Sequence, residues 1–291
     1  MDKEKRVKFL FLGKKLPSLP IIFTELRSLI DKPFVSNKMI SEVIKKDQSM
    51  MAKILKLSNS PLYGKRQEIT NLTNAITYLG YDRLKSIVLQ ISLIGMFKSK
   101  SNRIPDFKPS AFWEHSIRTA YISELIVKEL HLSQNENYYI AGLLHDIGKL
   151  LIYHVYPDEF EDIVLNQLNL DIPDYESEEE ILGVNHTDIG FYLSETWKFH
   201  KEINNSIGYH HKMLGSRMDL VTSIVSIANV FAKNAGLCLP WDKAIDIKSY
   251  VAWEFLKKKS KKEIIVNDIV NKIIEKTDSI KEAVSEMLKV I

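Results

Sequence analysis

The chain has 291 residues, of which 45% are hydrophobic and 26% are charged, as is typical of a soluble globular protein with a sizeable core. Forty basic residues against 37 acidic residues give a net charge of +3, which does not favour a nucleic-acid-binding protein. The single cysteine, Cys238, excludes an internal disulfide and fits a reducing cytoplasm.

The N-terminus begins with charged residues, but its apolar run is interrupted by Lys8 and stops at Gly13 without a small-residue cleavage pattern. We therefore expect no signal peptide. No stretch reaches the roughly 18 uncharged apolar residues that a membrane-spanning helix needs. These observations predict a cytoplasmic protein without a membrane span.

Nearly every apolar pattern has helical rather than alternating spacing. The clearest examples are residues 39–46, 50–59, 84–97 and 122–130. Asn-Ser-Pro at 59–61 predicts the end of one helix, and Gly80 followed by Asp82 predicts a C-cap and a new N-cap. The sequence therefore predicts an all-α fold of closely packed helices.

A linker is expected at residues 98–110, where basic and polar residues accompany two prolines. It divides the chain into an N-terminal helical half (1–100) and a second helical half (101–235), which a C-terminal helical extension (236–291) follows. The pair 40–59 and 70–95 could suggest tandem helix-turn-helix units, but the near-zero net charge does not favour DNA binding.

Two later segments have a distinct composition. Residues 169–180 are acidic, and we expect a loop that leads into a helix with glutamates in its first turn. In the C-terminal tail, Asp278 and Ser279 predict a break between two helices. We expect the apolar stripe of this tail to pack on the core. That stripe contains Ile269, Ile273, Ile280, Val284, Met287, Leu288 and Ile291.

Five of the eight histidines fall on the apolar faces of predicted helices. They are His115, His145, His186, His210 and His211. A lone histidine on such a face is more often a hydrogen-bonded core residue than a ligand. Five inward imidazoles beside the inward carboxylate of Asp146 could instead share one or two divalent cations. Nitrogen and oxygen donors suit Fe, Mn, Zn, Co or Ni alike.

His145 and Asp146 lie in the apolar run AGLLHDIGKLLIY, which we expect to be helical. Neighbours on a helix diverge by about 100°, so the two side chains could approach one cation from different directions or bridge two cations. Lys149 lies on an overlapping face, where it could contact a phosphate oxygen or extend to solvent at a helix end. Lys149 and Asp146 would then be the catalytic candidates for phosphate-ester hydrolysis.

The order of His115, the HDIGK segment and the later histidines resembles the HD superfamily of metal-dependent phosphohydrolases. Four further segments and Trp113 resemble the HDOD family, the HD-related output domain of bacterial signalling proteins. The segments are LPSLPIIFTELRSLI, ISEVIKKDQSMMAKILKLSNSPLYG, ITNLTNAITYLGYDRLKSIVL and LSETWKFHKEINNSIGYHH. The resemblance covers about residues 16–212 and implies an HD-phosphodiesterase-like helical bundle with a role in signal transduction, usually without demonstrated catalysis.

The resemblance also implies metal ligands, including positions used for a second metal in HD-GYP cyclic-dinucleotide phosphodiesterases. The implied ligands are His115, His145, Asp146, His186, His210, His211 and Asn229. Asn229 stands where catalytic relatives carry an aspartate, and a neutral amide should hold a cation more weakly. The glycine-tyrosine-proline signature of HD-GYP enzymes is absent. Asp47-Gln48 replaces the Asp-Pro pair of the family, which we expect to be a minor change at a helix start.

Two functions follow from these features. We favour a non-catalytic bacterial regulator that transmits a signal through protein contacts, with a metal or ligand held by the histidine cluster. The departures at Asn229 and in the glycine-tyrosine-proline segment support this function. The alternative is a metal-dependent phosphohydrolase acting on a nucleotide or cyclic nucleotide, which the retained histidines and Lys149 support. We expect signalling proteins as partners, and the oligomeric state stays open.

Overall fold

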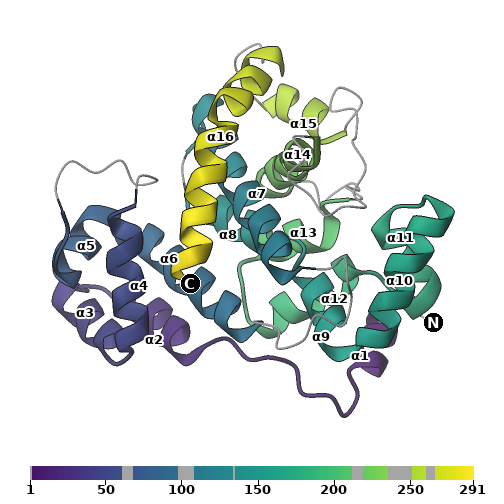
Figure 1. Cartoon of the computed structure of the whole chain (residues 1–291), viewed down its shortest axis with the longest axis horizontal. Helices are drawn as coiled ribbons and strands as arrows, with labels where there is room; N and C mark the ends of the chain where they lie inside the picture. The colour runs from purple at the N-terminus through teal and green to yellow at the C-terminus, as the bar shows by residue number, and fades with distance from the viewer. Residues whose placement is uncertain are drawn as a thin grey trace. The chain divides into compact units, whose positions relative to one another are not determined.

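The computed structural model describes residues 2–60, 68–97, 108–133, 135–211, 219–234, 251–259 and 266–291. These residues form α-helices and no β-strand, which confirms the predicted all-α fold. None of these helices is long and apolar enough to cross a membrane. The helices are α1 (Lys3–Leu10), α2 (Ile21–Ile30), α3 (Asn37–Lys45), α4 (Gln48–Ser58), α5 (Leu72–Leu79), α6 (Tyr81–Met96), α7 (Pro109–Glu129), α8 (Asn137–Leu144), α9 (Ile147–Val155), α10 (Pro157–Leu170), α11 (Asp174–Leu182), α12 (His186–Thr196), α13 (Lys201–Tyr209), α14 (Leu220–Asn234), α15 (Val251–Lys259) and α16 (Val266–Val290) (Figure 1).

The chain divides into two compact units. One unit contains residues 1–17 and 99–277, and the other contains residues 18–98 and 278–291. The linker expected at 98–110 falls where the chain passes between units, although its residues 98–107 lie outside the described part. The division of the chain at residues 100 and 235 into three segments stays a prediction.

Capping side chains explain where α3, α4 and α5 begin. Ser36, Asp47 and Asn71 each accept a hydrogen bond from a backbone N–H three residues later, which satisfies a donor that the helix leaves open. The cap at Asp47 agrees with a role for the Asp-Gln pair at a helix start. The end of α4 at Ser58 confirms the predicted stop at residues 59–61.

Gly80 separates α5 from α6 by itself. Its φ of 75° lies in the left-handed region, so one residue ends α5 and immediately precedes α6. Asp82 therefore lies in the first turn of α6, and its prediction as an N-cap was wrong. Its carboxylate there still favours the positive end of the helix dipole.

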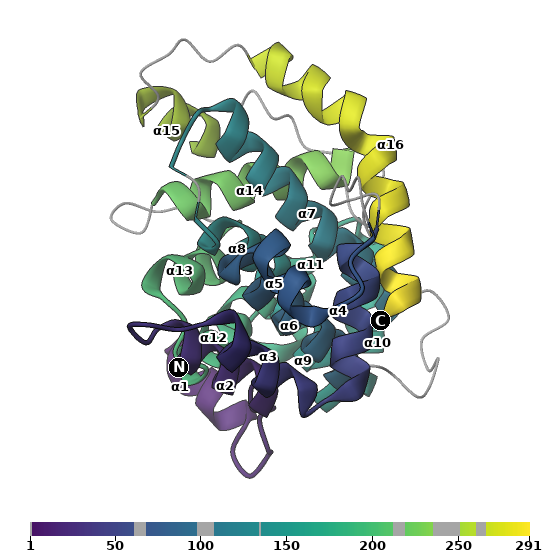
Figure 2. The ribbon, with the colours of Figure 1, turned by 90° about the vertical axis from the view of Figure 1, so that its left-hand side faces the viewer.

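The C-terminal helix α16 is continuous from Val266 to Val290 (Figure 2). The predicted break at Asp278 and Ser279 was wrong, because both residues lie on the exposed face of the helix, where polar side chains are tolerated. The apolar stripe passes this point without interruption. Its buried members confirm core packing, and they are Ile269, Ile273, Ile280, Val284 and Met287. Cys238 lies outside the described residues.

In the unit that carries the histidines, α7 packs on α8 and α14, while α12 packs on α9 and α13 (Figure 1). Two glycines allow the closest approaches. A Cβ on Gly142 of α8 would lie 2.7 Å from the Cα of Ala120 in α7, and a Cβ on Gly148 of α9 would lie 2.0 Å from the carbonyl oxygen of His186 in α12. The glycines therefore bring together the helices that hold the histidines.

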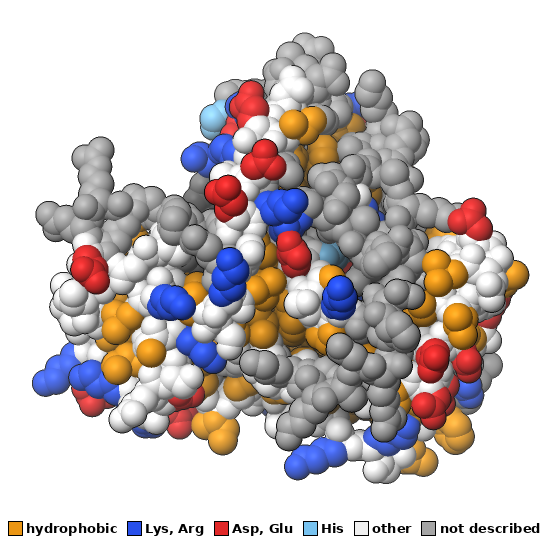
Figure 3. Space-filling view, in the orientation of Figure 1, with side chains coloured by type: hydrophobic (Ala, Val, Ile, Leu, Met, Phe, Trp, Pro, Cys, Tyr) orange, Lys and Arg blue, Asp and Glu red, His pale blue; other side chains and the backbone are white. Residues whose placement is uncertain are grey.

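The acidic segment at 169–180 forms the end of α10, a turn at Asp171 with φ 55°, and most of α11. Asp174 and Glu176 occupy the first turn of α11, as predicted for an acidic helix start. Acidic and apolar side chains gather over α10 and α11 on the face shown in Figure 3. The exposed leucines there are Leu165, Leu168 and Leu170.

Candidate metal centre

His145 and Asp146 lie in the turn between two helices. Helix α8 ends at Leu144 and α9 begins at Ile147, so the expectation that both residues lie inside one helix was wrong. The apolar pattern continues through this turn, and no glycine or proline marks it. The turn brings Nε2 of His145 to 3.4 Å from Oδ2 of Asp146 and directs both side chains into the same buried site.

The first group of candidate ligands is His115, His145 and Asp146. Nε2 of His115 lies 3.4 Å from Nε2 of His145 and 4.0 Å from Oδ2 of Asp146. All three side chains are buried. His115 extends from the middle of α7, on the apolar stripe that the sequence predicts.

The second group uses the other oxygen of the same carboxylate. Oδ1 of Asp146 lies 3.2 Å from Nε2 of His186 and 3.3 Å from Nε2 of His210. His211 completes this group, since all its ligand atoms lie within 4.8 Å of one another. The structure thus brings together six of the seven predicted ligands, namely Asp146 and five histidines around it.

His186 is the first residue of α12, so it lies at a helix start and not on the apolar face of a helix that continues from Leu182. Leu182 ends α11, and Gly183 turns the chain with φ 74° before α12 begins. The side chain of Asn185 caps α12, which fixes where this helix and its first residue start. His210 directly follows α13 and is fully buried.

The second ring nitrogens show that the site suits a cation. Nδ1 of His186 lies 2.7 Å from Oε2 of Glu178, and Nδ1 of His145 and of His210 contacts backbone carbonyl oxygens. Because these oxygens only accept, we assign the proton to Nδ1 in each ring. In the neutral form of each ring, which metal binding requires, Nε2 would present a lone pair toward the Asp146 carboxylate. A divalent cation among these atoms would remove the repulsion between the nitrogen lone pairs and the carboxylate oxygens.

The charges in the cluster depend strongly on one another. Burial alone would lower the pKa of His186, but the carboxylates of Glu178 and Asp146 overcome it and raise this pKa to about 9. Burial lowers the pKa of His210 to about 4, with a further contribution from His145. Burial opposes ionisation of Asp146, yet His145 and Lys149 hold its pKa well below the usual range. The Asp146 carboxylate is therefore ionised at neutral pH.

Lys149 is buried in an ion pair with two carboxylates. Its Nζ lies 2.8 Å from Oδ2 of Asp146 and 2.5 Å from Oδ2 of Asp174. With 3% of its surface exposed, Lys149 does not extend to solvent at a helix end. Burial opposes ionisation of Asp174, but Lys149 and then Lys233 hold the pKa of Asp174 well below its usual range.

The sequence reasoning missed Asp174 and Glu178. Both lie on the inner face of α11, one turn apart, and both are buried. Their spacing of four residues was a readable signal, since positions i and i+4 share a helix face. It was hidden because exposed Glu176 and other acidic residues surround them, and such a segment is usually solvated.

Asn229 lies on α14 and is buried, with 3% of its surface exposed. Its Oδ1 accepts no hydrogen bond from the described residues. A buried carbonyl oxygen without a donor is a suitable cation ligand. The assignment of Asn229 as a ligand stays a prediction.

Comparison with known proteins agrees with this architecture. A model of the HDOD domain matches residues 16–213. An uncharacterised protein of Treponema pallidum (strain Nichols) is 24% identical over 199 residues, which cover 68% of this chain and 38% of that protein. The present chain therefore matches less than half of the length of this relative.

Three solved structures share the fold. An HDOD domain protein of unknown function from Geobacter sulfurreducens superposes with a TM-score of 0.87 at 24% identity over 98% of each chain. A candidate signal transduction protein from Marinobacter aquaeolei VT8 has a TM-score of 0.75 at 16% identity, over 98% of this chain and 66% of that one. A candidate phosphohydrolase from Shewanella amazonensis SB2B has a TM-score of 0.73 at 21% identity, over 97% and 98%. Since the domain model covers well over half of the sequence and the fold agrees, the chain belongs to the HDOD family.

Proposed function

We propose that this HDOD protein is a bacterial cytoplasmic regulator in which the histidine cluster holds a divalent cation in a structural or sensing role. The burial of the ligands carries the proposal: His145 and His186 are 0% exposed and Asp146 is 2% exposed. A cation held by these side chains would be shielded from a phosphodiester substrate. The likeness to a candidate signal transduction protein is consistent with this role.

The residues of the chain define what such a cation would do. When bound, the cation would compensate the Asp146 carboxylate and accept the lone pairs of the surrounding imidazoles. Glu178 orients His186 through the contact at Nδ1, which fixes the ring for coordination by Nε2. Fe, Mn, Zn, Co and Ni all suit this donor set, as one ion or two.

Occupancy of the site would link four structural elements. The ligands come from the turn after α8, from the start of α12 and from the end of α13, with His115 added from α7. Loss of the cation would remove the positive charge that joins these elements. We infer that protein partners respond to this change in the packing of the helices.

Hydrolysis of a phosphate ester is the second candidate function. It is favoured by the shared carboxylate of Asp146, whose two oxygens face different histidine groups, as suits a pair of metal ions. Metal ions at such a site supply activated water and Lewis-acid polarisation of phosphate oxygens. For Lys149 to bind substrate, its ammonium would have to leave Asp174, from which it is 2.5 Å away.

The test begins with elemental metal content, measured on protein purified at low oxygen without a metal-affinity step. Near-stoichiometric metal is expected in the wild type and in His154→Ala, a matched control because His154 lies on α9 and outside the cluster. His145→Ala should lose the metal. Wild-type protein without metal, even after incubation with Mn or Fe, would contradict the proposal.

A second measurement separates the two functions. The metal-loaded protein is incubated with bis(4-nitrophenyl) phosphate, and turnover is compared with that of His145→Ala and Asp146→Ala. Bound metal without turnover supports the regulatory role. Turnover that both substitutions abolish, with helicity retained by circular dichroism, would support the phosphohydrolase.

A further inference from the structure

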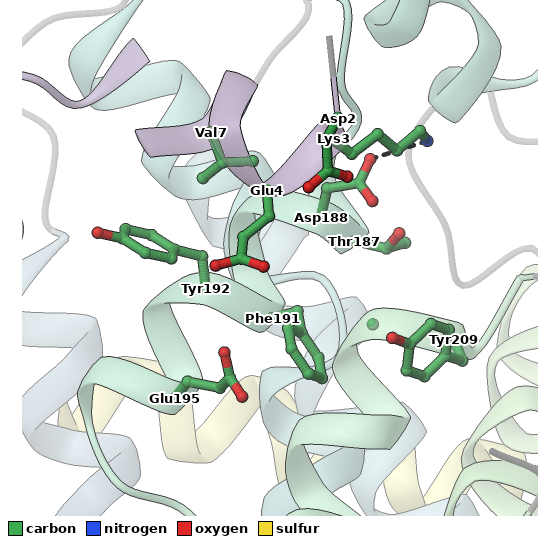
Figure 4. Close-up of a pocket in the computed structure, with 11 residues that line it drawn as sticks. Asp2, Lys3, Glu4, Val7, Thr187, Asp188, Phe191, Tyr192, Glu195 and Tyr209 are labelled. Carbon is green, nitrogen blue, oxygen red and sulfur yellow. Dashed lines mark hydrogen bonds and ion pairs between the residues drawn. The ribbon is translucent and has the colours of Figure 1, made fainter. Parts of the chain in front are cut away.

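A cavity of about 330 Å³ lies between α1, α12 and α13, separate from the predicted ligand set. Helix α1 contributes Val7, α12 contributes Phe191 and Tyr192, and α13 contributes Tyr209 (Figure 4). Small-molecule sites commonly have volumes of about 300–1,000 Å³, so this cavity is large enough for a small ligand or one long side chain.

The aromatic wall of the cavity depends on one glycine. The rings of Phe191 and Tyr209 lie 5.7 Å apart between centroids, inclined at 59°. A Cβ on Gly208 would lie 2.6 Å from Cδ2 of Phe191, so a larger residue would displace this ring. The absence of a side chain at Gly208 therefore keeps the wall in place.

Four carboxylates and one ammonium also line the cavity. The carboxylates belong to Asp2, Glu4, Asp188 and Glu195. The ammonium of Lys3 is 3.0 Å from Asp188 and extends away from the aromatic rings, while Glu4 pairs with a lysine one turn later in α1 (Figure 4). Asp2 and Glu195 form no ion pair with the described residues, although Lys8 attracts the charge of Glu195 at longer range. Four carboxylates therefore face the two ammonium groups of Lys3 and Lys8, and the cavity keeps a negative balance.

We propose that this cavity binds an organic cation, namely a guanidinium or a primary ammonium group on an apolar stem. The stem would pack against Val7 and Phe191, and the charged group would lie near Tyr192 and Glu195. A cation near an aromatic face is attracted by the quadrupole of the ring, and the carboxylates add Coulombic attraction. The same chemistry could come from a small amine or from a basic side chain of a partner protein.

The cavity adjoins two helices of the metal centre. Its lining residues Thr187 and Asp188 directly follow His186, and Tyr209 directly precedes His210. A ligand in the cavity would therefore contact backbone next to two candidate metal ligands. This link to signalling rests on the proposed function, whereas binding of the organic cation in the cavity does not.

Isothermal titration calorimetry on the full chain tests the binding. The first pair of probes is n-butylguanidinium and its neutral analogue n-butylurea, and the second pair is acetyl-Gly-Arg-Gly-amide and the same peptide with citrulline. We expect saturable binding of the cationic probe in at least one pair, weakened by added salt, and no binding of the neutral probes. Tighter binding of the small guanidinium would favour a free amine as the source, and tighter binding of the peptide would favour a basic protein segment.

Variants locate the site. Glu195→Gln should weaken binding by up to about fivefold, as for an exposed charge pair, and Tyr192→Leu should weaken it by about two- to fivefold through loss of the ring. Glu161→Gln, an exposed control on α10, should bind as the wild type does. Equal binding of the neutral probes, or unchanged binding in both Glu195→Gln and Tyr192→Leu, would overturn the proposal. Titration after metal removal by a chelator keeps this outcome distinct from a failure of the proposed metal site.

Discussion

The ammonium of Lys149 lies between the carboxylates of Asp146 and Asp174, with its Nζ 2.8 Å from one and 2.5 Å from the other. All three side chains are buried. The ion pair therefore connects α9 to α11 and places a positive charge beside the candidate metal ligands. Because buried charges are costly without partners, each member of this group depends on the others.

Asp174→Asn should destabilise the protein by about 3–5 kcal/mol, since it leaves the buried ammonium of Lys149 with one carboxylate fewer. The free energy of unfolding is measured in urea. Glu176→Gln is the matched control, because Glu176 lies in the same first turn of α11 but is exposed, and it should change stability little. An equal loss in both variants would mean that the ion pair does not stabilise the fold.

The stability of the metal-free protein should be greatest near pH 6.5, the ordinary pKa of histidine. The pKa of His186 is raised to about 9, so its stabilising charge is fully present below pH 6.5 and is lost as the pH rises towards 9. The pKa of His210 is lowered to about 4, so protonation of the unfolded chain reduces stability as the pH falls from 6.5 to 4. His186 could contribute at most about 3 kcal/mol on the alkaline side.

Urea unfolding in the presence of a chelator, repeated from pH 4 to 9, checks this profile. Glu178→Gln should flatten the alkaline side, because Glu178 is the main cause that raises the pKa of His186, and should leave the acidic side in place. A profile that is flat above pH 6.5 in the wild type would show that His186 is not protonated in the folded protein.

Gly148→Ala should disrupt the metal centre from outside the ligand set. The added Cβ would lie 2.0 Å from the carbonyl oxygen of His186, so α9 and α12 must separate. We expect the free energy of unfolding to fall by about 1–3 kcal/mol, as for overpacked cores, and metal binding to weaken. Gly95→Ala is the control: it has open space on α6 and should stabilise its helix by about 0.5–1 kcal/mol. Normal metal affinity in Gly148→Ala would show that the two helices can part without moving His186.

Asn229→Asp should tighten metal binding if Asn229 is a ligand, because a carboxylate adds a compensating charge. Affinity is measured by competition with a chromophoric chelator at constant pH. Asn166→Asp, on α10 and outside the ligand set, adds the same charge and should leave the affinity unchanged. The ligand assignment of Asn229 fails if both variants bind metal as the wild type does.

Most of the fold could be predicted because apolar residues recur at helical spacing in nearly every part of the sequence. The histidines that meet around Asp146 could be predicted for the same reason, since each of them interrupts or borders an apolar stripe. The turn at His145 and Asp146 could not be predicted, because the apolar pattern continues on both sides of it. The partners Asp174 and Glu178 could not either, because burial among acidic neighbours depends on tertiary packing rather than on local sequence.

The division of one carboxylate between two histidine groups has a consequence for the order of loading. A cation held by His115, His145 and Asp146 would lower the electron density that the same carboxylate could offer to a cation near His186 and His210. Two cations on this carboxylate would also repel each other in a buried site. The second ion would therefore bind more weakly than the first, so that the two halves fill at different metal concentrations and the site responds over a wider range than one ion alone.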